Sequence, residues 1–468
     1  MRDAVGCEGN CARRVQPIMV RAWLLMSTLS LLAGCGTVPA IASLPATATA
    51  EQPSAVPSIT APQRANTPPT NLPTWTPQPT TLATPIPTEA PTPELLNYEE
   101  RRQIFEEVWR TVKDHYLYTD FHHLDWNAVH DEYTRMLEQA QSRDTFYAMM
   151  VEMVARLNDE HSRFLPPAEV QTENATISNS EVTVGIGVLT RPRPDGGFIQ
   201  SVFPDSPAAR ADLAPRDRII AVDGRPYTAD DGNLLGEAGS SVRLTVVRPG
   251  EKLRDVVLTR QEVQNHIVPS YRRFPGNIGY VAIPTMWVND MDEQVNGALT
   301  DLVAEGPLDG VIIDVRSNGG GWLYVLSGVL SHFVRGQVGM FFSRQAIRPL
   351  EIGAPAGPDL RHAKVVVLVD NETASYAEVL AAVLQQEGQA TIIGTHTAGN
   401  TETTYAYTLT DGSRLWLAQE GFRLPNGQNL EGVGVQPDIL LDIDWTHYSE
   451  DDDPQLLEAL RQLGGGPK

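Results

Sequence analysis

The sequence predicts a multidomain α/β protein, in which a helical N-terminal region and a small inserted β domain precede a layered α/β core. Three observations support this fold class. Apolar residues recur at helical spacing early in the folded part, short β-rich runs fill the middle, and strand and helix patterns alternate from Gly279 onward. Alternation of this kind is typical of a layered sheet whose strand ends offer a place for a functional site.

The helical region is expected over residues 97–175. Two sets of apolar residues recur there at a spacing of three or four, as on one face of a helix. The first set is Ile104, Val108, Val112 and Tyr116, and the second is Phe146, Met150, Met153 and Leu157. We therefore expect two amphipathic helices.

The β domain is expected over 181–263 and the layered α/β core over 270–445. Apolar, β-branched runs in the core are short enough for buried strands: Tyr280–Ile283, Val311–Val315, Val365–Val369 and Thr391–Ile393. The remaining residues, 446–468, form an acidic and glycine-rich C-terminal tail. We expect its runs Asp451-Asp-Asp and Gly464-Gly-Gly to be frayed.

The first 35 residues resemble a lipoprotein signal peptide. A short basic start precedes the apolar run Ala22–Leu32, which is shorter than the about 20 residues that a bilayer span needs. The run ends in Leu32-Ala-Gly-Cys35, which resembles a bacterial lipobox whose cysteine is lipidated. This predicts an extracytoplasmic protein anchored to the bacterial cell membrane through Cys35. An ordinary cleaved signal with a free Cys35 is the alternative, and Met19 is a candidate for the true start.

A stalk is expected over residues 36–96, which are dominated by Pro, Thr and Ala and contain hardly any charge. Such a stretch cannot bury enough apolar surface to offset the entropy of ordering it. We therefore expect a disordered linker between the anchor and the folded domains.

Charge and residue spacing disfavour a nucleic-acid partner and a metal centre. The chain has 36 Lys and Arg against 58 Asp and Glu, a net charge of -22, whereas nucleic-acid binding needs a basic face. One group of histidines and aspartates could suggest a metal site, but its residues lack a chelating spacing such as His-Glu-x-x-His. Its members are His115, Asp120, His122, His123 and Asp125. We expect no metal and no cofactor.

The best chemical signal lies where the run Val365–Val369 gives way to a helix pattern. Ser375 follows it at the expected helix start, where unpaired N–H groups and the helix dipole favour negative charge. An oxyanion could be stabilised there. A plain helix N-cap is the alternative interpretation of such a serine.

A second signal is the glycine turn after the run Val311–Val315. Three consecutive glycines, Gly319 to Gly321, permit backbone geometries closed to other residues, and their N–H groups can approach a ligand closely. The turn is therefore a candidate second donor to an oxyanion, with an ordinary tight turn as the alternative.

Four strings together resemble the tail-specific, or S41, peptidase family in their order and spacing. They are Asp314-Val-Arg-Ser-Asn-Gly-Gly-Gly, Val367-Leu-Val-Asp-Asn-Glu-Thr-Ala-Ser-Tyr-Ala-Glu, Gly394-Thr-His-Thr-Ala-Gly-Asn400 and Phe422-Arg-Leu-Pro-Asn-Gly-Gln-Asn-Leu-Glu-Gly-Val-Gly-Val-Gln-Pro-Asp438. The resemblance covers roughly residues 98–440 and includes a PDZ domain. It implies an S41 protease core and, together with the lipobox at Cys35, a membrane-anchored serine endopeptidase.

By this resemblance Ser375 is the nucleophile. The N–H groups of Tyr376 and Gly320, or alternatively Gly319, would form the oxyanion hole. The processing branch of the family uses a lysine base and a glutamine four residues later, but this chain has Asn400 and Thr404 there. A neutral amide cannot accept the serine proton, so a Ser/Lys dyad is not expected.

A second branch, which includes the tricorn core protease and a chlamydial secreted protease, uses Ser, His and Glu. Its histidine string is similar to Leu157-Asn-Asp-Glu-His161 in this chain, and its glutamate string is similar to the one that starts at Glu431. The resemblance therefore implies His161 as the base and Glu431 as its carboxylate partner. His396, near Asn400, is an alternative base.

The PDZ resemblance implies capture of substrate C-termini. The carboxylate of the peptide would be held by backbone N–H groups at Gly185, Ile186 and Gly187, with the peptide added as a strand. The expected partners are proteins and peptides with free C-termini. Because the lysine is missing, an inactive lipoprotein of the same fold that binds peptides or lipids is the alternative function.

Overall fold

The computed structural model describes residues 96–465, except for 140–141, 160 and 229–233. The predicted signal peptide, stalk and lipidation site Cys35 lie outside these described residues. None of the helices in the described part of the chain combines the length and apolar character that a membrane span requires.

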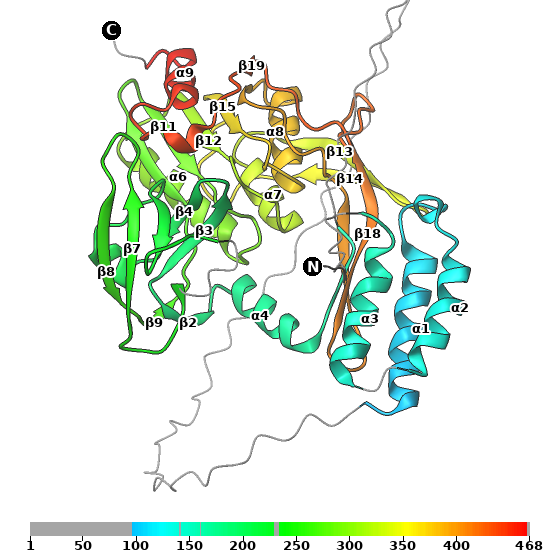
Figure 1. Cartoon of the computed structure of the whole chain (residues 1–468). Helices are drawn as coiled ribbons and strands as arrows, with labels where there is room; N and C mark the ends of the chain where they lie inside the picture. The colour runs from blue at the N-terminus through cyan, green and yellow to red at the C-terminus, as the bar shows by residue number, and fades with distance from the viewer. Residues whose placement is uncertain (1–95, 140–141, 160, 229–233, 466–468) are drawn as a thin grey trace, which may run out of the picture. The chain divides into compact units, whose positions relative to one another are not determined.

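The helical N-terminal region buries the two apolar faces predicted from spacing. Every residue of the two predicted sets is buried, which confirms both amphipathic helices. Asn97 begins the first helix in a capping box, because its side chain accepts the Glu100 N–H and the Glu100 carboxylate accepts the Asn97 N–H. The elements are α1 (Tyr98–His115), η1 (Phe121–His123), α2 (Trp126–Leu137), α3 (Arg143–Ala155), β1 (Arg163–Leu165) and α4 (Pro167–Ile177) (Figure 1).

The β domain contains an antiparallel sheet in the order β3-β4-β5-β7-β8, with β6 paired to β5 and a separate β2–β9 pair. In β7, Val242, Leu244 and Val246 are buried and the residues between them are more exposed, as the two-residue period of a strand requires. The elements are β2 (Val182–Gly185), β3 (Val188–Arg193), β4 (Gly196–Val202), α5 (Pro207–Arg210), β5 (Arg218–Val222), β6 (Arg225–Pro226), β7 (Ser241–Val247), β8 (Arg254–Thr259) and β9 (Gln261–Gln264).

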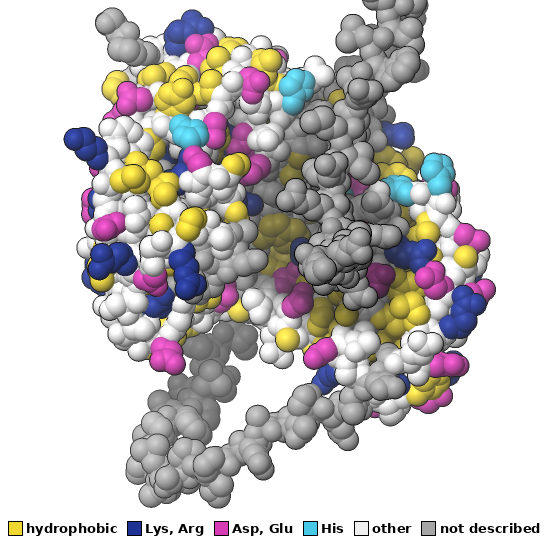
Figure 2. All heavy atoms as spheres, viewed as in Figure 1, with side chains coloured by type: hydrophobic (Ala, Val, Ile, Leu, Met, Phe, Trp, Pro, Cys, Tyr) yellow, Lys and Arg dark blue, Asp and Glu magenta, His cyan; other side chains and the backbone are white. Residues whose placement is uncertain are grey.

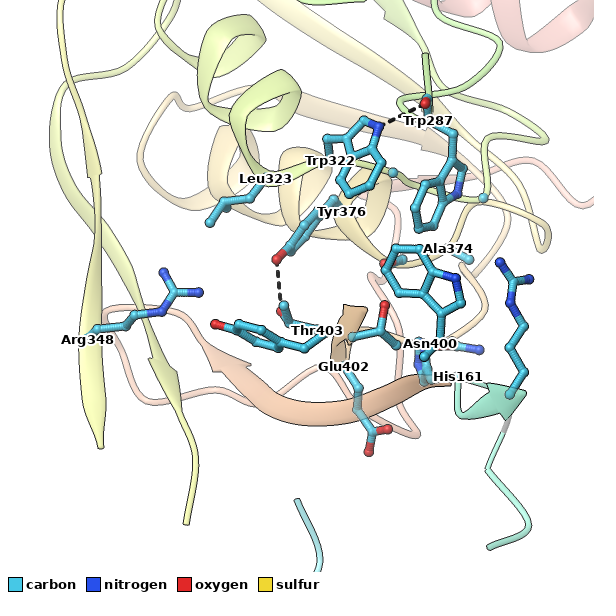
Figure 3. Close-up of a pocket in the computed structure, with 17 residues that line it drawn as sticks. His161, Trp287, Trp322, Leu323, Arg348, Ala374, Tyr376, Asn400, Glu402 and Thr403 are labelled. Atoms are coloured by element: carbon cyan, nitrogen blue, oxygen red, sulfur yellow. Dashed lines mark hydrogen bonds between the residues drawn. The ribbon is translucent and has the colours of Figure 1, made fainter. Parts of the chain in front are cut away.

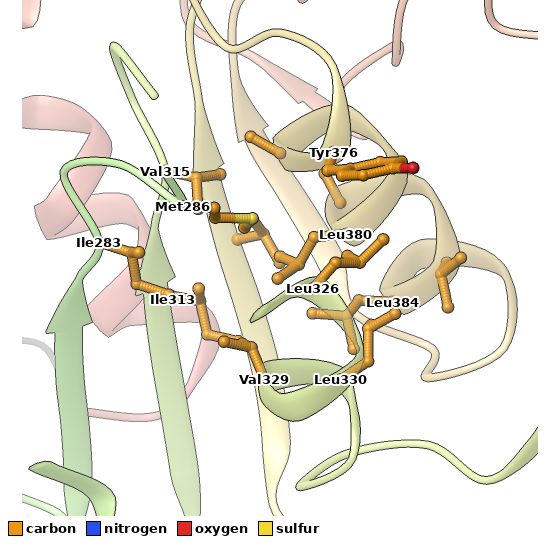
Figure 4. Close-up of a cluster of buried hydrophobic side chains, with 14 of the residues drawn as sticks. Ile283, Met286, Ile313, Val315, Leu326, Val329, Leu330, Tyr376, Leu380 and Leu384 are labelled. Atoms are coloured by element: carbon orange, nitrogen blue, oxygen red, sulfur yellow. The ribbon is translucent and has the colours of Figure 1, made fainter. Parts of the chain in front are cut away.

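The core sheet has the order β10-β11-β12-β15-β16-β19 and is parallel from β11 to β19. One face packs on helices α6 to α8, and Figure 4 shows Ile313 facing Leu326 and Leu380 across this interface. The other face packs on α9. Burial on both faces explains the continuous apolar runs in the sequence. The elements are β10 (Ser270–Phe274), β11 (Ile278–Ala282), α6 (Met291–Ala304), β12 (Gly310–Asp314), α7 (Leu323–Leu330), β15 (Lys364–Val369), α8 (Tyr376–Gln386), β16 (Thr391–Gly394), β19 (Ile439–Leu440) and α9 (Pro454–Gln462).

A second sheet, in the order β1-β18-β13-β14 with β17 also paired to β18, joins the helical region to the core. Its first strand, β1, belongs to the helical region in sequence, and it places Arg163 opposite Trp416 of β18. The short segment before β1, which contains His161, is thereby brought to the core. The remaining elements are β13 (Gly336–Phe342), β14 (Ile347–Ile352), β17 (Thr403–Thr408), β18 (Arg414–Arg423) and η3 (Trp445–His447).

The prediction that the run Asp451-Asp-Asp is frayed is wrong for its last residue, Asp453, which is buried directly before α9. Leu456 and Ala459 are completely buried against the core sheet. Asp453, from the acidic run, caps α9 and accepts hydrogen bonds from Arg216 at 3.0 Å and Arg316 at 2.8 Å. Asp453 can be buried because these two arginines compensate its carboxylate.

Charged side chains of both signs are scattered over the described part of the face shown in Figure 2. Lysines and arginines alternate there with aspartates and glutamates. On this face a polyanion would therefore meet acidic groups as well as basic ones.

Candidate active site

Ser375 lies at the turn between β15 and α8, directly before the first helical residue, Tyr376. Its φ of 56° and ψ of -129° are unfavourable for a residue with a Cβ. The turn is held in place because the Ser375 N–H donates to the Asn400 carbonyl at 2.7 Å and the Ala374 N–H donates to the Asn318 carbonyl at 2.9 Å. A strained turn fixed by its neighbours holds a short side chain in one position, as a nucleophile requires.

The glycine turn, Gly319–Gly321, packs directly against Ser375. A Cβ on Gly320 would lie 2.6 Å from the Ser375 Cβ and 2.9 Å from the Tyr376 nitrogen, so only glycine permits this approach. The Tyr376 N–H has no acceptor within α8, because it belongs to the first turn. The Gly320 N–H, by contrast, donates to the Asn318 side-chain oxygen at 2.8 Å. Both residues predicted to hold the oxyanion thus lie beside Ser375, and one of their two N–H groups is already engaged.

His161 lies in the turn between α3 and β1. Asp159 fixes this turn, because one carboxylate oxygen accepts the N–H of His161 at 2.9 Å and of Ser162 at 2.5 Å, and the other accepts the Tyr116 hydroxyl at 2.7 Å. The Ser162 hydroxyl accepts the Ala418 N–H at 3.1 Å. These bonds tie the turn to the end of α1 and to β18.

A cavity of about 370 Å³ has both His161 and Ser375 in its lining. In Figure 3, His161 and Asn400 lie together at one end of the lining and Arg348 lies at the other. Further residues that carry the predicted motifs also contribute: Gly319, Gly321, Tyr376 and Thr404. The fold therefore brings the predicted nucleophile and the predicted base to one place.

Glu378, in the first turn of α8, ties the serine turn to the loop that contains Asn400. It is completely buried and accepts four hydrogen bonds. The donors are the Thr397 hydroxyl and the N–H groups of Gly399 at 2.7 Å, Asn400 at 2.9 Å and Ser375 at 3.1 Å. Burial raises the pKa of Glu378, and these hydrogen bonds oppose that rise.

Glu431 and Glu402 occupy different places relative to the cavity. Glu431 accepts the Thr401 N–H at 2.7 Å and the Thr401 hydroxyl at 3.2 Å, and it is not one of the lining residues. Glu402 lines the cavity, and one of its oxygens accepts the Tyr118 hydroxyl. Its other oxygen, Oε2, is buried without a hydrogen-bond partner among the described residues. Burial raises the pKa of Glu402 to about 7, and the charge of Glu431 acts in the same direction.

Glu402 was not among the residues predicted from the sequence, whereas Glu431, which was predicted, lies outside the lining. Glu402 lies two residues after Asn400, at a position that belongs to no recognised string, so nothing in the sequence singles it out. The alternative base, His396, is exposed and lies outside the cavity lining.

Of the predicted peptide-binding residues, Gly185 ends β2, and Ile186 and Gly187 lie between β2 and β3. Ile186 is buried in the apolar cluster of the β domain, and its carbonyl accepts the Ala208 N–H at 2.9 Å. Strand β3, which follows, stands at one end of the order of described strands in its sheet. An end strand is where an added peptide strand can pair.

Strand β3 also contacts the active-site turns. Arg193 forms an ion pair with Glu372, which lies three residues before Ser375, and donates to the Ser317 hydroxyl at 3.1 Å. Arg191 donates to the Ser317 carbonyl at 2.9 Å. The β domain is therefore connected by side chains to both turns that surround Ser375.

Comparisons with known proteins agree with this arrangement. Residues 277–441 match Peptidase family S41, residues 97–155 match the Tricorn protease C1 domain, and residues 198–248 match a PDZ domain. These three matches correspond to the core, the helical region and the β domain, respectively, and they confirm the predicted α/β fold class.

Relatives and solved structures extend the likeness over most of the chain. A chloroplastic C-terminal processing peptidase from Tetradesmus obliquus is 30% identical over 383 residues, 76% of this chain and 79% of that protein. A carboxyl-terminal-processing protease from Synechocystis sp. is 27% identical over 388 residues, 80% of this chain and 90% of that protein.

The structure of the photosystem II D1 C-terminal processing protease is similar, with a TM-score of 0.52 and 28% identity, over 73% of this chain and 93% of that one. A putative S41 protease from Bacteroides fragilis shares the fold, with a TM-score of 0.54 and 18% identity, over 77% of this chain and 97% of that one. The chain therefore belongs to peptidase family S41 and is a serine-type peptidase with a PDZ domain.

Proposed function

We propose that this peptidase is an exported endopeptidase, anchored to the bacterial cell membrane through lipidated Cys35, that uses Ser375, a histidine and a glutamate rather than a Ser/Lys dyad. The observation that carries the catalytic part is the common cavity lined by Ser375 of the core and His161 of the helical region. The anchor rests on the sequence of the first 35 residues alone.

The reaction is acyl transfer to water. The Ser375 hydroxyl oxygen attacks the carbonyl carbon of the scissile peptide bond while His161 accepts the hydroxyl proton. The tetrahedral intermediate then expels the amine, which takes that proton from His161, and an acyl-enzyme ester remains. A water molecule gives a proton to His161 and attacks the ester, and the proton returns to Ser375 as the second product leaves.

The oxyanion of each tetrahedral intermediate would be held at the start of α8. The Tyr376 N–H and the helix dipole favour negative charge there. Gly320 can contribute only when its N–H is released by, or shared with, the Asn318 side chain. The second donor is therefore engaged in the structure described here.

A carboxylate beside His161 would hold its tautomer and stabilise the imidazolium. The resemblance assigns this role to Glu431, whereas the cavity lining favours Glu402. Glu402→Gln and Glu431→Gln, compared for kcat, separate the two assignments. The larger loss identifies the partner of His161.

The catalytic assignment is tested with the full-length protein in detergent and a fluorophosphonate probe, which labels an activated serine. We expect Ser375→Ala to abolish labelling and His161→Ala to slow it at least about 100-fold. His396→Ala is the matched control, since this exposed histidine lies outside the lining, and it should label like the wild type. Full labelling of His161→Ala would overturn the assignment of the base.

Substrate capture through the PDZ domain is the remaining part of the proposal. Proteins with free, apolar C-termini would add a strand to β3, with their carboxylate held by N–H groups near Gly185 to Gly187. A matched peptide pair tests this, with one member ending in a free carboxylate and the other in an amide. We expect the amide to bind at least about 10-fold more weakly, and equal binding would contradict the proposal.

A further inference from the structure

One wall of the catalytic cavity is formed by three tryptophans from different elements. Trp287 follows β11, Trp322 directly precedes α7, and Trp416 lies in β18, and all three line the cavity. The ring centroids of Trp287 lie 5.2 Å from those of Trp322 and 5.5 Å from those of Trp416. The Trp322 and Trp416 rings are 6.1 Å apart. Each ring therefore contacts both others, and we call the three residues the tryptophan cluster.

The glycine turn fixes the cluster beside the nucleophile. A Cβ on Gly321 would lie 2.0 Å from the Met286 carbonyl carbon, so this glycine lets the turn contact the residue before Trp287. The Trp322 N–H donates to the Met286 carbonyl at 3.0 Å, and its indole N–H donates to the Trp287 carbonyl at 2.8 Å, as drawn in Figure 3. Because the same turn packs on Ser375, the distance between cluster and nucleophile is set by backbone contacts.

The cluster presents mainly apolar surface to the cavity, because two of its three indole N–H groups are engaged elsewhere. The indole N–H of Trp416 is already engaged by the Glu173 carboxylate at 3.0 Å, and that of Trp322 by a carbonyl. Trp416 is buried, but Trp287 and Trp322 remain partly exposed. A ligand can therefore remove ring surface from water, which is favourable for an apolar group.

The charged side chains of the lining already bind partners that lie outside the lining. Arg348 is paired with Glu420 at 2.5 Å, and Arg163 with Glu173 at 2.8 Å. Glu402 carries a hydrogen bond from a tyrosine and has a pKa of about 7. A charged substrate side chain would lose its hydration here and would have to compete with existing partners. The cavity therefore favours uncharged groups.

We propose that the tryptophan cluster is the pocket for an aromatic or long apolar side chain of the substrate residue next to the scissile bond. The inference rests on the proposed function, because it takes Ser375 as the attacking group. A large ring or long aliphatic chain would contact several indoles at once, whereas alanine would reach none of them. We expect kcat/KM to be about 10- to 100-fold higher for phenylalanine than for alanine at this position.

The first test needs no known substrate. The full-length enzyme is incubated with casein, an unstructured protein, and the cut sites are mapped by mass spectrometry. We expect Phe, Tyr, Trp, Leu and Met to be enriched at one position that flanks the cut. An even distribution, or enrichment of small or charged residues at both flanking positions, would overturn the inference.

The second test uses a peptide from that experiment in two forms, with Phe or Ala at the flanking position. Trp322→Ala should lower kcat/KM for the Phe form about 10-fold and change it for the Ala form less than about 2-fold. Trp322→Phe should keep most of the preference. Trp109→Phe, in helix α1, is the matched control and should behave as the wild type.

Fluorophosphonate labelling separates this inference from the proposed function. A wild-type enzyme that neither labels nor cleaves contradicts the proposed function, whereas one that labels and cleaves both peptide forms equally contradicts only the pocket. If Trp322→Ala loses labelling, the Phe and Ala forms of the peptide are compared with Trp287→Ala instead, because Trp287 is another residue of the cluster. An unchanged preference for Phe in the labelled tryptophan variants would also overturn the pocket.

Discussion

The cavity has a nucleophile side, at the proposed nucleophile Ser375, and a base side, at the proposed base His161. Each side contains a buried carboxyl group, but the two groups differ in how they are compensated. Glu378, beside Ser375, accepts four hydrogen bonds. Glu402, in the same lining as His161, accepts one from Tyr118 and has an oxygen without a partner among the described residues. Hydrogen bonds as well as burial therefore decide how easily a buried carboxyl group ionises. On the nucleophile side, Glu378 and its four hydrogen bonds hold the Ser375 turn in place, and we call this arrangement the scaffold. On the base side, the carboxyl group of Glu402 has a pKa of about 7.

Removing the scaffold carboxylate should have the largest effect. Glu378→Ala leaves four donors without their acceptor, each at a cost of about 1–3 kcal/mol when it stays buried. We expect fluorophosphonate labelling to be lost and the free energy of unfolding to fall by more than about 3 kcal/mol, measured by chemical denaturation. Glu387→Ala, at the exposed end of the same helix, is the control. Normal labelling of Glu378→Ala would show that the serine turn does not need this carboxylate.

Loosening the base side should have a smaller effect on stability but a clear effect on turnover. Asp159→Ala removes the acceptor of the His161 and Ser162 N–H groups, so the imidazole loses its fixed position. We expect kcat to fall about 10- to 100-fold. Tyr116→Phe is the control, because it removes only the hydroxyl that bonds Asp159 and leaves the turn intact. An unchanged kcat in Asp159→Ala would mean that His161 is positioned by other contacts.

The third prediction concerns how protein stability depends on pH through the carboxyl group of Glu402. Burial raises the pKa of Glu402 from its ordinary value of 4.5 to about 7, with Tyr118, Glu431 and Asp159 around it. Between about pH 4.5 and about pH 7, Glu402 is ionised in the unfolded chain but still protonated in the folded one. The protonated group therefore stabilises the fold at low pH, and this stabilisation is lost as the pH rises through about 7. Glu402→Gln does not titrate. From about pH 5 to about pH 8, its free energy of unfolding should rise by about 1–3 kcal/mol relative to the wild type.

Denaturation curves at several pH values measure this difference. Tyr118→Phe provides a second test. The tyrosine hydrogen bond lowers the pKa of Glu402, so its removal should move the pH at which stability falls to a higher value. Parallel pH profiles for the wild type and Glu402→Gln would mean that Glu402 ionises at its ordinary pKa.

The smallest expected effect concerns the contact between the β domain and the nucleophile side. Arg193→Ala removes the ion pair with Glu372, and the other carboxylate contacts of the scaffold stay in place. We expect the free energy of unfolding to fall by about 1 kcal/mol or less. Arg225→Ala, an exposed arginine on β6 of the same domain, is the control. A loss as large as that of Glu378→Ala would make the β domain part of the scaffold.

Much of the fold could be predicted from local pattern. The spacing of Ile104, Val108 and Val112 gave a helix, and the apolar run at Val365–Val369 gave a buried strand followed by Ser375 at a helix start. These features depend on residues close together in the chain. The prediction of a frayed run Asp451-Asp-Asp failed at Asp453, because this residue is buried and bonded to Arg216 and Arg316, which lie far from it in sequence.

The sequence by itself determined the family strings, the nucleophile turn and the apolar periods of the helices and strands, because each depends on neighbours within a few residues. Tertiary structure decided what gathers around Ser375. It brought His161 there through the pairing of β1 with β18, and it placed Glu402, Trp287 and Trp322 in the same lining. No short-range sequence pattern predicts that these residues lie close together. Their proximity depends on long-range strand pairing and on burial that only the folded chain creates.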